Sequence, residues 1–288
     1  MRVLVTGVKG QLGYDVVNEL KRRNHEAIGV DVEDMDVTDK NAVYKVIGEV
    51  KPDAVVHCAA WTAVDAAEDP LNFEKVKRIN VDGTQYIAEI CKKLSAKMVY
   101  ISTDYVFNGL GEVPWQPDCK EFAPLNIYGE TKMRGEKAVS DLLEKYFIVR
   151  ISWVFGKNGN NFVKTMLKLS ENHKTLRVVN DQIGTPTYTF DLSRLLVDMI
   201  ETEKYGYYHA TNEGGYISWA DFAKEIFKQA GKSTIVLPVS TEEYGVSRAK
   251  RPFNSRLDKS KLTTYGFKKL PTWQDALARY LSELKENS

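Results

Sequence analysis

The sequence has almost no net charge and no long apolar run. Its 40 lysine and arginine residues nearly balance 39 aspartate and glutamate residues, which leaves a formal charge of +1. A chain so balanced has no overall field that would attract nucleic acid or an anionic membrane surface. No apolar stretch approaches the roughly 20 residues that a membrane-spanning helix needs. We therefore expect no nucleic-acid or membrane partner, and any recognition of phosphate must be local.

Cysteines are few and do not form pairs in the sequence. Cys58, Cys91 and Cys119 are an odd set without the Cys-x-x-Cys spacing of redox and zinc sites. A disulfide framework and a zinc site are therefore not expected, and the compartment is predicted to be the reducing cytoplasm. No basic and apolar leader precedes the first strand pattern, which also favours a cytoplasmic location. A chain of 288 residues is long enough for one or two domains.

Glycines near the start of the chain separate a strand pattern from a helix pattern. Residues 3–5 are apolar, as in a strand buried on both faces of a parallel sheet. Gly7, Gly10 and Gly13 follow at three-residue spacing, and apolar residues then recur at helical intervals over 12–20. Glycines at these positions permit a tight turn and bring a pyrophosphate close to a helix N-terminus. The pattern predicts a dinucleotide site, and the alternative is a βα turn without a ligand.

Strand and helix patterns alternate through the first half of the chain. Further strands are predicted at 25–30, 54–58, 97–101 and 147–151. This alternation predicts an α/β fold, a Rossmann-type doubly wound parallel sheet over residues 1–160. We expect the cofactor to cross the sheet at a switch point between the first and fourth strands. Beyond that point the alternation loosens, and residues 161–288 are predicted to form most of a smaller α/β substrate domain, interleaved with the first.

Acidic and small residues follow the second and third predicted strands. Asp31 comes directly after the second strand, where a carboxylate can accept hydrogen bonds from the adenosine ribose and repel a 2′-phosphate. NADH is therefore expected to be favoured over NADPH, the alternative being that Asp31 serves only the turn. Asp36 and Val37 are expected beside the adenine. The third strand ends in AAWT at residues 59–62, whose alanines leave room for a ligand.

Two residues at helical spacing suit acid–base chemistry. Tyr128 and Lys132 are four apart, so they project from one face of the predicted helix. A tyrosine hydroxyl has a pKa of about 10, and a neighbouring ammonium would lower it. Thr103 ends the fourth strand and could bond a carbonyl oxygen beside Tyr128. In this candidate catalytic set Thr103 polarises, Tyr128 donates a proton and Lys132 tunes the tyrosine. The alternative is a plain surface pair.

Two other stretches of the first half carry hypotheses. The irregular stretch 108–126 contains Trp115 and Phe122, which argue against disorder, so it is predicted to cover the substrate. Asn80 interrupts the apolar face of a helix pattern. It could be buried, where it would hold a kink or a water molecule, or it could lie at the surface.

Together these patterns resemble the extended short-chain dehydrogenase/reductase family over nearly the whole chain. The glycine turn, Ala59-Ala60, Ser102-Thr103 and Tyr128-x-x-x-Lys132 carry the resemblance. Within the family the chain is most similar to the dTDP-4-dehydrorhamnose reductase branch, on the runs AVDAAE (63–68), STDYVF (102–107), PLNIYG (124–129), GNNF (159–162), NDQIGTP (180–186) and RPFNS (251–255). The resemblance implies that NADH or NADPH reduces the C4 ketone of a dTDP-linked 4-keto-6-deoxyhexose, dTDP-4-dehydro-L-rhamnose, to dTDP-L-rhamnose.

The resemblance also implies roles for individual residues. Tyr128 would donate the proton, Lys132 would bind the nicotinamide ribose, and Thr103 would contact the sugar. Asp104 and Trp153 are likewise implied to lie beside the sugar. The expected cofactor contacts are Gly7, Gly10, Gln11, Leu12, Asp31, Asp36, Val37, Ala59, Ala60, Trp61, Thr62, Ser102, Tyr128 and Lys132.

A near-neutral protein must hold a charged nucleotide sugar with donors placed locally. Asn161 lies in a turn that feeds a helix, whose amides could receive the diphosphate. Arg251 is followed by a proline, and an arginine fork matches phosphate oxygens in a bidentate way. Both are predicted substrate contacts, and the alternative for Arg251 is a solvated basic loop.

The sequence also departs from some relatives. Where these place glutamates for a magnesium ion at a dimer interface, this chain has Asp15 and Phe190, so no metal is expected and the chain is predicted to be a monomer or a homodimer. Related dehydratases carry an acidic residue where Tyr105 stands, which disfavours elimination of water. Other nucleotide-sugar 4-ketoreductases and epimerases stay open, as does a non-catalytic regulatory subunit resembling that of methionine adenosyltransferase.

Overall fold

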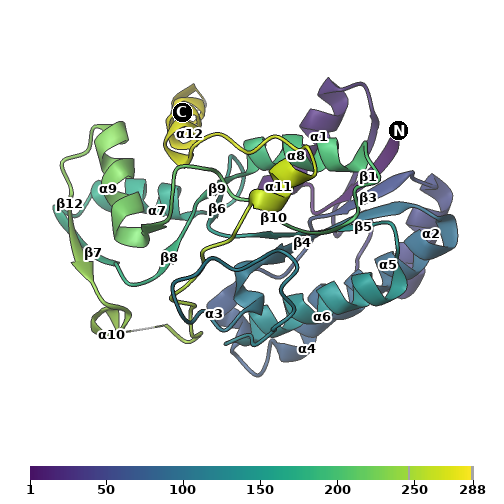
Figure 1. Ribbon diagram of the computed structural model, residues 1–288, viewed down its shortest axis with the longest axis horizontal. Helices are drawn as coiled ribbons and strands as arrows, with labels where there is room; N and C mark the ends of the chain where they lie inside the picture. The colour runs from purple at the N-terminus through teal and green to yellow at the C-terminus, as the bar shows by residue number, and fades with distance from the viewer. Residues whose placement is uncertain (246, 287–288) are drawn as a thin grey trace.

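A six-stranded parallel sheet forms the centre of the larger lobe (Figure 1). The computed structural model describes residues 1–245 and 247–286, and the order of the strands is β10-β5-β4-β3-β1-β2. The strands are β1 (Arg2–Thr6), β2 (Glu26–Val30), β3 (Ala54–His57), β4 (Lys97–Thr103), β5 (Tyr146–Ile151) and β10 (Gly206–His209). Every neighbouring pair in this sheet is parallel.

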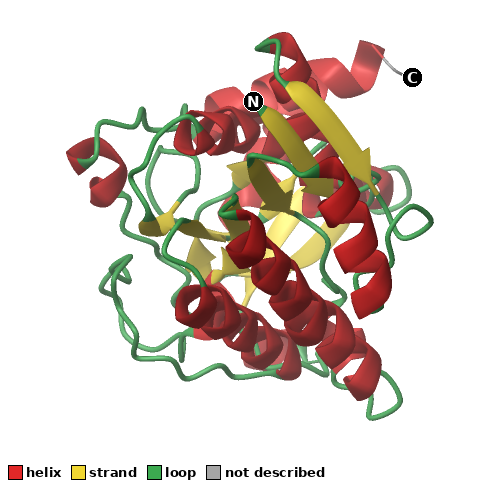
Figure 2. Cartoon of the chain, turned by 90° about the vertical axis from the view of Figure 1, so that its right-hand side faces the viewer, coloured by secondary structure: helices red, strands yellow, loops and turns green. Residues whose placement is uncertain are grey.

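Helices cover both faces of the sheet, as Figure 2 shows. On one face α1 (Gln11–Arg22) and α8 (Thr189–Ile200) form a core with Val3 and Val5 of β1. On the other face Leu4 packs in a second core with residues of α2, α5 and α6. These helices are α2 (Lys40–Val50), α5 (Gly83–Leu94) and α6 (Ile127–Leu142). Alternate residues of a strand point to opposite faces, so the continuous apolar run of β1 places side chains in both cores. The predicted doubly wound α/β fold is confirmed.

The position of the switch point differs from the prediction. β1 pairs with β2 on one side and with β3 on the other, so the chain reverses direction between β1 and β3. Successive right-handed crossovers in one direction would place their helices on the same face of the sheet. Here α2 lies on the opposite face from α1, as a reversal requires. The predicted switch point between the first and fourth strands is therefore wrong, because the third strand returns to pair with β1.

A distorted helix follows β3. The short helices α3 (Val64–Ala67) and α4 (Phe73–Lys77) lead into a π-helix, η1 (Arg78–Asp82), which continues into α5. Asn80 is buried in this π-helix, where its amide donates to the Trp61 carbonyl and to the Thr131 hydroxyl. The π turn widens the backbone of the helix at Asn80, whose side chain bridges the segment after β3 and α6. Of the alternatives for Asn80, the buried position is confirmed.

The smaller lobe is built from the second half of the chain. Its main helices are α7 (Phe162–Ser170), α9 (Trp219–Ala230) and α12 (Trp273–Glu286), and its main strands are β7 (Thr175–Val179) and β12 (Ile235–Val239). Its minor elements are β6 (Val154–Phe155), β8 (Ile183–Gly184), β9 (Thr187–Tyr188), β11 (Ile217–Ser218) and α10 (Thr241–Tyr244). In the larger lobe, η2 (Asp104–Val106) packs on α6 and α11 (Ser260–Thr264) packs on β10. An aromatic core that includes Phe155, Phe222 and Tyr280 holds this lobe together.

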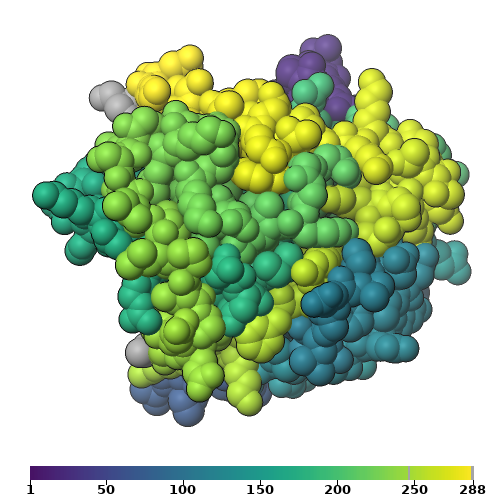
Figure 3. Space-filling view, turned by 60° about the vertical axis from the view of Figure 1, so that its left-hand side comes forward, coloured from purple at the N-terminus to yellow at the C-terminus, as the bar shows by residue number. Residues whose placement is uncertain are grey.

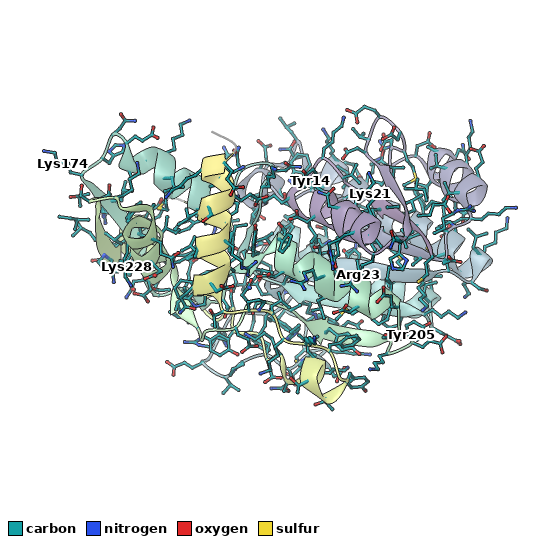
Figure 4. The ribbon with its side chains drawn as sticks, turned by 90° about the horizontal axis from the view of Figure 1, so that it is seen from above. Tyr14, Lys21, Arg23, Lys174, Tyr205 and Lys228 are labelled. Carbon is teal, nitrogen blue, oxygen red and sulfur yellow. The ribbon has the colours of Figure 1, made fainter. Side chains whose placement is uncertain are left out.

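The two halves of the sequence are interleaved. β10 pairs with β5, and α8 packs beside α1, although both follow residue 160. Arg23, just after α1, donates to Asp198 of α8 at 2.6 Å and to Glu201 at 3.1 Å, and Figure 4 shows it where these helices lie side by side. The division at residue 160 stays a prediction.

The irregular stretch 108–126 is held in place by the C-terminal part of the chain. The Trp115 N–H donates to the Arg256 carbonyl, and the Asp258 N–H donates to the Trp115 carbonyl, both at 2.9 Å. Figure 3 shows this stretch, in blue-teal, against the yellow-green C-terminal segments. Throughout the described part of the chain no helix is long and apolar enough to cross a membrane.

Candidate active site

A large cleft opens at the carboxyl ends of β1, β3, β4 and β5. Its volume is about 1280 Å³, and its walls include the glycine turn and the ends of these four strands. In open α/β sheets this edge is where ligands bind, beside the switch point. The cleft is larger than the 300–1,000 Å³ or so of typical small-ligand pockets, so it has room for two extended ligands.

The glycines of the turn let neighbouring backbone segments pack closely against one another. Gly7 has a φ of +68°, and a Cβ there would lie 2.8 Å from the Ala59 amide nitrogen. A Cβ at Gly13 would collide with the Gly7 carbonyl. Gly10 precedes α1, and no side chain caps the first amides of that helix. Free amides and the helix dipole suit a pyrophosphate, so the turn fits the predicted dinucleotide. Gly7, Gly10, Gln11 and Leu12 all line the cleft.

Asp31 marks the far end of the cleft, with Asp36 and Val37 beside it. Its carboxylate accepts the Lys9 N–H and the Val32 N–H, each at 2.9 Å. Asp31 therefore ties the glycine turn to the end of β2. Each carboxylate oxygen keeps a second lone pair, so these bonds leave room for ribose hydroxyls.

The segment after β3 follows the cleft except at one residue. Ala59, Ala60 and Thr62 line the cleft, whereas Trp61 is not among its lining residues. The Trp61 N–H donates to the Asn80 side chain at 2.8 Å, and its indole nitrogen donates to the Ala63 carbonyl. Trp61 is held outward by these bonds, and its predicted cofactor contact stays a prediction.

The structure brings the three predicted catalytic residues and Ser102 together in the cleft. Thr103 is the last residue of β4, and Tyr128 and Lys132 lie in the first two turns of α6. Asn126 caps this helix by accepting the Gly129 N–H at 2.8 Å. The cap fixes where the helix begins, and thereby where the hydroxyl of Tyr128 lies relative to the strand end.

Burial controls the ionisation of Tyr128 and Lys132. Burial raises the pKa of Tyr128 well above its ordinary value, with the Asp104 charge adding to the effect and a hydrogen bond with Thr103 opposing it. The predicted lowering of the tyrosine pKa by Lys132 is therefore wrong. Burial also lowers the pKa of Lys132 to about 7, against the charge of Glu136. The Lys132 ammonium lies 4.1 Å from the centre of the Tyr100 ring.

A buried ionic network lies next to the predicted catalytic residues. The Ser102 hydroxyl donates to Glu136 at 2.5 Å, and the Arg150 guanidinium donates to both oxygens of Glu136 at 2.8 Å. Arg150 also donates to the carbonyls of Pro117 and Cys119 in the loop 108–126. Neither charged residue was among the site residues predicted from the sequence. Two signals could have found them: Glu136 is one turn beyond Lys132, and Arg150 interrupts an apolar strand.

Asp104 and Trp153 lie at the opposite end of the cleft from Asp31. Burial raises the pKa of Asp104 to about 6, although hydrogen bonds with Ser255 and Thr103 work in the other direction. Trp153 has a φ of +51°, which is rare for a residue with a bulky side chain. A protonatable carboxyl and a strained aromatic residue are features of a functional surface.

Two predicted substrate contacts are not brought into the cleft. Asn161 caps α7, and its amide donates to Gln11, to the Gly156 carbonyl and to the Tyr280 hydroxyl. Its neighbour Asn160 lines the cleft instead. The predicted contact of Asn161 with the diphosphate stays a prediction.

Arg251 likewise lies outside the lining of the cleft. Its guanidinium binds the carboxylate of Asp65 in α3, with the shorter contact at 2.6 Å. The same carboxylate accepts the Ala249 N–H at 3.0 Å, so the pair anchors this segment to the larger lobe.

The two positions compared with metal-binding relatives lie on α1 and α8. Asp15 is buried, and burial raises its pKa to about 6, whereas Phe190 is exposed. Across the described residues, no three His, Cys, Asp or Glu side chains come together as a metal site would require.

The dinucleotide fold, the glycine turn and the Thr103–Tyr128–Lys132 set define a nicotinamide-dependent oxidoreductase of the short-chain dehydrogenase/reductase class. Comparison with known proteins refines this class. The chain belongs to the family described as the RmlD substrate binding domain, whose model matches residues 1–286.

Relatives of the chain are similar over almost their full length. It is 38% identical to the dTDP-4-dehydrorhamnose reductase of Aggregatibacter actinomycetemcomitans, covering 96% of this chain and 97% of that one. It is 41% identical to the spore coat polysaccharide biosynthesis protein SpsK of Bacillus subtilis, covering 98% and 97%.

Solved structures agree with these comparisons. The crystal structure of a dTDP-4-dehydrorhamnose reductase from Clostridium acetobutylicum superposes with a TM-score of 0.94 at 42% identity, covering 99% of this chain and 100% of that one. The dTDP-4-dehydrorhamnose reductase of Bacillus anthracis, solved in complex with NADP, gives a TM-score of 0.93 at 42% identity, covering 98% and 99%.

Proposed function

We propose that this chain reduces the C4 ketone of dTDP-4-dehydro-L-rhamnose to dTDP-L-rhamnose with NADH or NADPH. The observation that carries the proposal is the placement of Thr103, Tyr128 and Lys132 in one cleft with the glycine turn. The relatives named as dTDP-4-dehydrorhamnose reductases support the substrate, because they match almost the whole of this chain.

The ionisation of the site suits reduction. Since burial raises its pKa, Tyr128 is protonated at neutral pH and can give its proton to the oxygen at C4. The Thr103 hydroxyl bonds Tyr128 and donates to the Asp104 carboxylate at 2.9 Å. In the proposed reaction it turns from Asp104 to the same substrate oxygen. The bound nicotinamide supplies the hydride.

Lys132 has its own task beside the tyrosine. With a pKa lowered to about 7, it can donate hydrogen bonds to ribose hydroxyls in either protonation state. The negative charge of Glu136, one turn further along α6, favours the protonated form.

The functions of related proteins, such as dehydration or epimerisation, fit the residues of this site less well. Tyr105 lines the cleft directly after Asp104, and burial raises its pKa far above neutral, so it is no substitute for the carboxylate of a dehydratase. A structural neighbour described as a UDP-glucose 4-epimerase is 20% identical, which shows the shared fold alone. A non-catalytic regulatory role would not require the complete catalytic set.

The decisive assay mixes the purified chain with dTDP-4-dehydro-L-rhamnose and reduced cofactor. We expect oxidation of the cofactor together with formation of dTDP-L-rhamnose. The Tyr128→Phe variant should lose about 10²–10⁴-fold in kcat, because positioned acid catalysis contributes that much. It should still bind the cofactor. Normal turnover by Tyr128→Phe would mean that another group donates the proton.

A further inference from the structure

Trp219 stands beside Trp153 at the substrate end of the cleft. The two indole rings are stacked, with centroids 3.7 Å apart and an angle of 15° between their planes, and both residues line the cleft. Trp219 begins α9, where Ser218 closes a capping box with Asp221. Trp153 follows β5 of the sheet. The stack therefore joins the two lobes at the edge of the cleft.

The position of Trp153 relative to the catalytic residues follows from the sheet. Thr103 of β4 pairs with Ile151 of β5, and Trp153 comes two residues later at the same carboxyl edge. On the other side of Trp153, β8 separates it from Ser255, which bonds Asp104. This side of the cleft thus lies away from Asp31 and beside Asp104, whose charge acts on Tyr128.

The backbone of Trp153 is strained, and several contacts hold it so. A non-glycine residue at φ +51° persists only where its surroundings fix it. The Thr187 N–H donates to the Trp153 carbonyl at 3.1 Å, and the Ser152 hydroxyl donates to the Thr185 carbonyl at 2.9 Å. A Cβ at Gly184 would lie 2.9 Å from the indole atom Cε2, so only glycine leaves room for the ring.

We propose that Trp219 is a positioning residue for the sugar of the substrate: it holds Trp153 in its strained conformation, and the stacked pair forms an aromatic wall beside the reacting carbon. The wall suits the C–H face and the methyl group of a 6-deoxyhexose, because apolar groups favour an aromatic surface. This inference rests on the proposed function and extends it to a residue that the sequence analysis did not single out.

The test compares two ligands that differ only by the sugar. Binding of dTDP-L-rhamnose and of dTDP is measured by calorimetry for the unmodified chain, Trp219→Leu and Gly184→Ala. Both variants should weaken dTDP-L-rhamnose about five- to tenfold, as expected for one lost aromatic contact, and change dTDP less than about twofold. In steady-state assays KM for the sugar nucleotide should rise, while KM for the cofactor holds.

Trp273→Phe is the matched control, because Trp273 packs on Phe222 in the same lobe and does not line the cleft. It should leave both ligands unchanged. Equal losses for dTDP and dTDP-L-rhamnose, or the same losses in the control, would overturn the inference. So would unchanged binding in both Trp219→Leu and Gly184→Ala. If the unmodified chain binds dTDP but not dTDP-L-rhamnose, the proposed function fails, and the inference fails with it.

Discussion

The guanidinium of Arg150 donates two hydrogen bonds of 2.8 Å to the carboxylate of Glu136, and both side chains are fully buried. Glu136 also accepts the Ser102 hydroxyl, and Arg150 reaches the loop 108–126 through two carbonyl bonds. One ion pair therefore connects the end of β4, helix α6 and the loop 108–126. Buried pairs of this kind are costly to break, because the remaining charge has no partner.

Removing one member of this pair should destabilise the protein strongly. Arg150→Met leaves Glu136 charged and buried, and we expect a loss of about 3–5 kcal/mol in the free energy of unfolding. Lys228→Met is the matched control, because Lys228 is 77% exposed in its ion pair with Glu225. That change should cost about 1 kcal/mol or less. Urea unfolding measures both, and a loss in Arg150→Met no larger than that of the control would show that the pair contributes little.

Much of the fold follows from local patterns, whereas the order of the strands does not. The apolar runs and the spacing of the glycines predict the strands β1 to β5, because each pattern depends on neighbours in the chain. The reversal between β1 and β3 depends on which face α2 covers, and no local pattern of the sequence specifies that face. β12 was not predicted, because its run IVLPV contains Pro238 and gains regular structure by pairing with β7.

In the candidate site, too, some residues could be predicted from local patterns of the sequence and others could not. Thr103, Tyr128 and Lys132 could be chosen from spacing and chain order alone. Trp219 could not, since it lies 66 residues from Trp153 in the sequence and the two rings stack only in the folded protein. The error over the pKa of Tyr128 has a similar cause, because the depth of burial belongs to the folded protein and not to the spacing of two residues.

Stability should depend on pH through Asp104. Its pKa is about 6 in the folded protein, above the value of about 3.9 expected in the unfolded chain. Between these values the folded state binds more protons, so stability falls as pH rises from about 4 to 6. Asp104→Asn removes the contribution of this carboxyl to the pH dependence of stability. Relative to the unmodified chain, we expect it to gain up to about 3 kcal/mol at pH 7 and almost nothing at pH 4.

Urea unfolding of both proteins at several pH values checks this expectation. Other carboxyls, including Asp15, titrate in both proteins and cancel in the difference. A difference between the two proteins that does not change with pH would show that Asp104 is ionised to the same extent in the folded and unfolded states.

Arg251 offers a test of how the nucleotide sugar is held. We expect Arg251→Ala to raise KM for the sugar nucleotide and to leave KM for the cofactor nearly unchanged, because a guanidinium suits a diphosphate. The structure supplies the comparison, since Asp65 binds Arg251 and the backbone of Ala249. Asp65→Asn loosens the same segment but keeps the guanidinium. An equal rise in KM for both variants would assign Arg251 to anchoring the segment.

Asp31 should set the choice between NADH and NADPH. Its carboxylate lines the cleft at the end of β2, and the 2′-phosphate of NADPH would bring a second negative charge close to it. We expect the unmodified chain to have a higher kcat/KM with NADH. Lys9 lies nearby but is bound to Glu33 at 2.7 Å, so its charge is already partly neutralised. Steady-state rates with each cofactor, at saturating sugar nucleotide, measure the preference.

Replacement of the carboxylate should shift this preference in a predictable direction. Asp31→Ser removes the repulsion and keeps a small polar side chain, so the ratio of kcat/KM for NADPH to that for NADH should rise about tenfold, which corresponds to 1.4 kcal/mol. Asp34→Ser is the control, because Asp34 accepts the Asp31 N–H at 2.9 Å and is acidic, but does not line the cleft. It should leave the ratio within about twofold, well inside 1 kcal/mol. Equal ratios in all three proteins would mean that the carboxylate of Asp31 serves only to hold the glycine turn through Lys9.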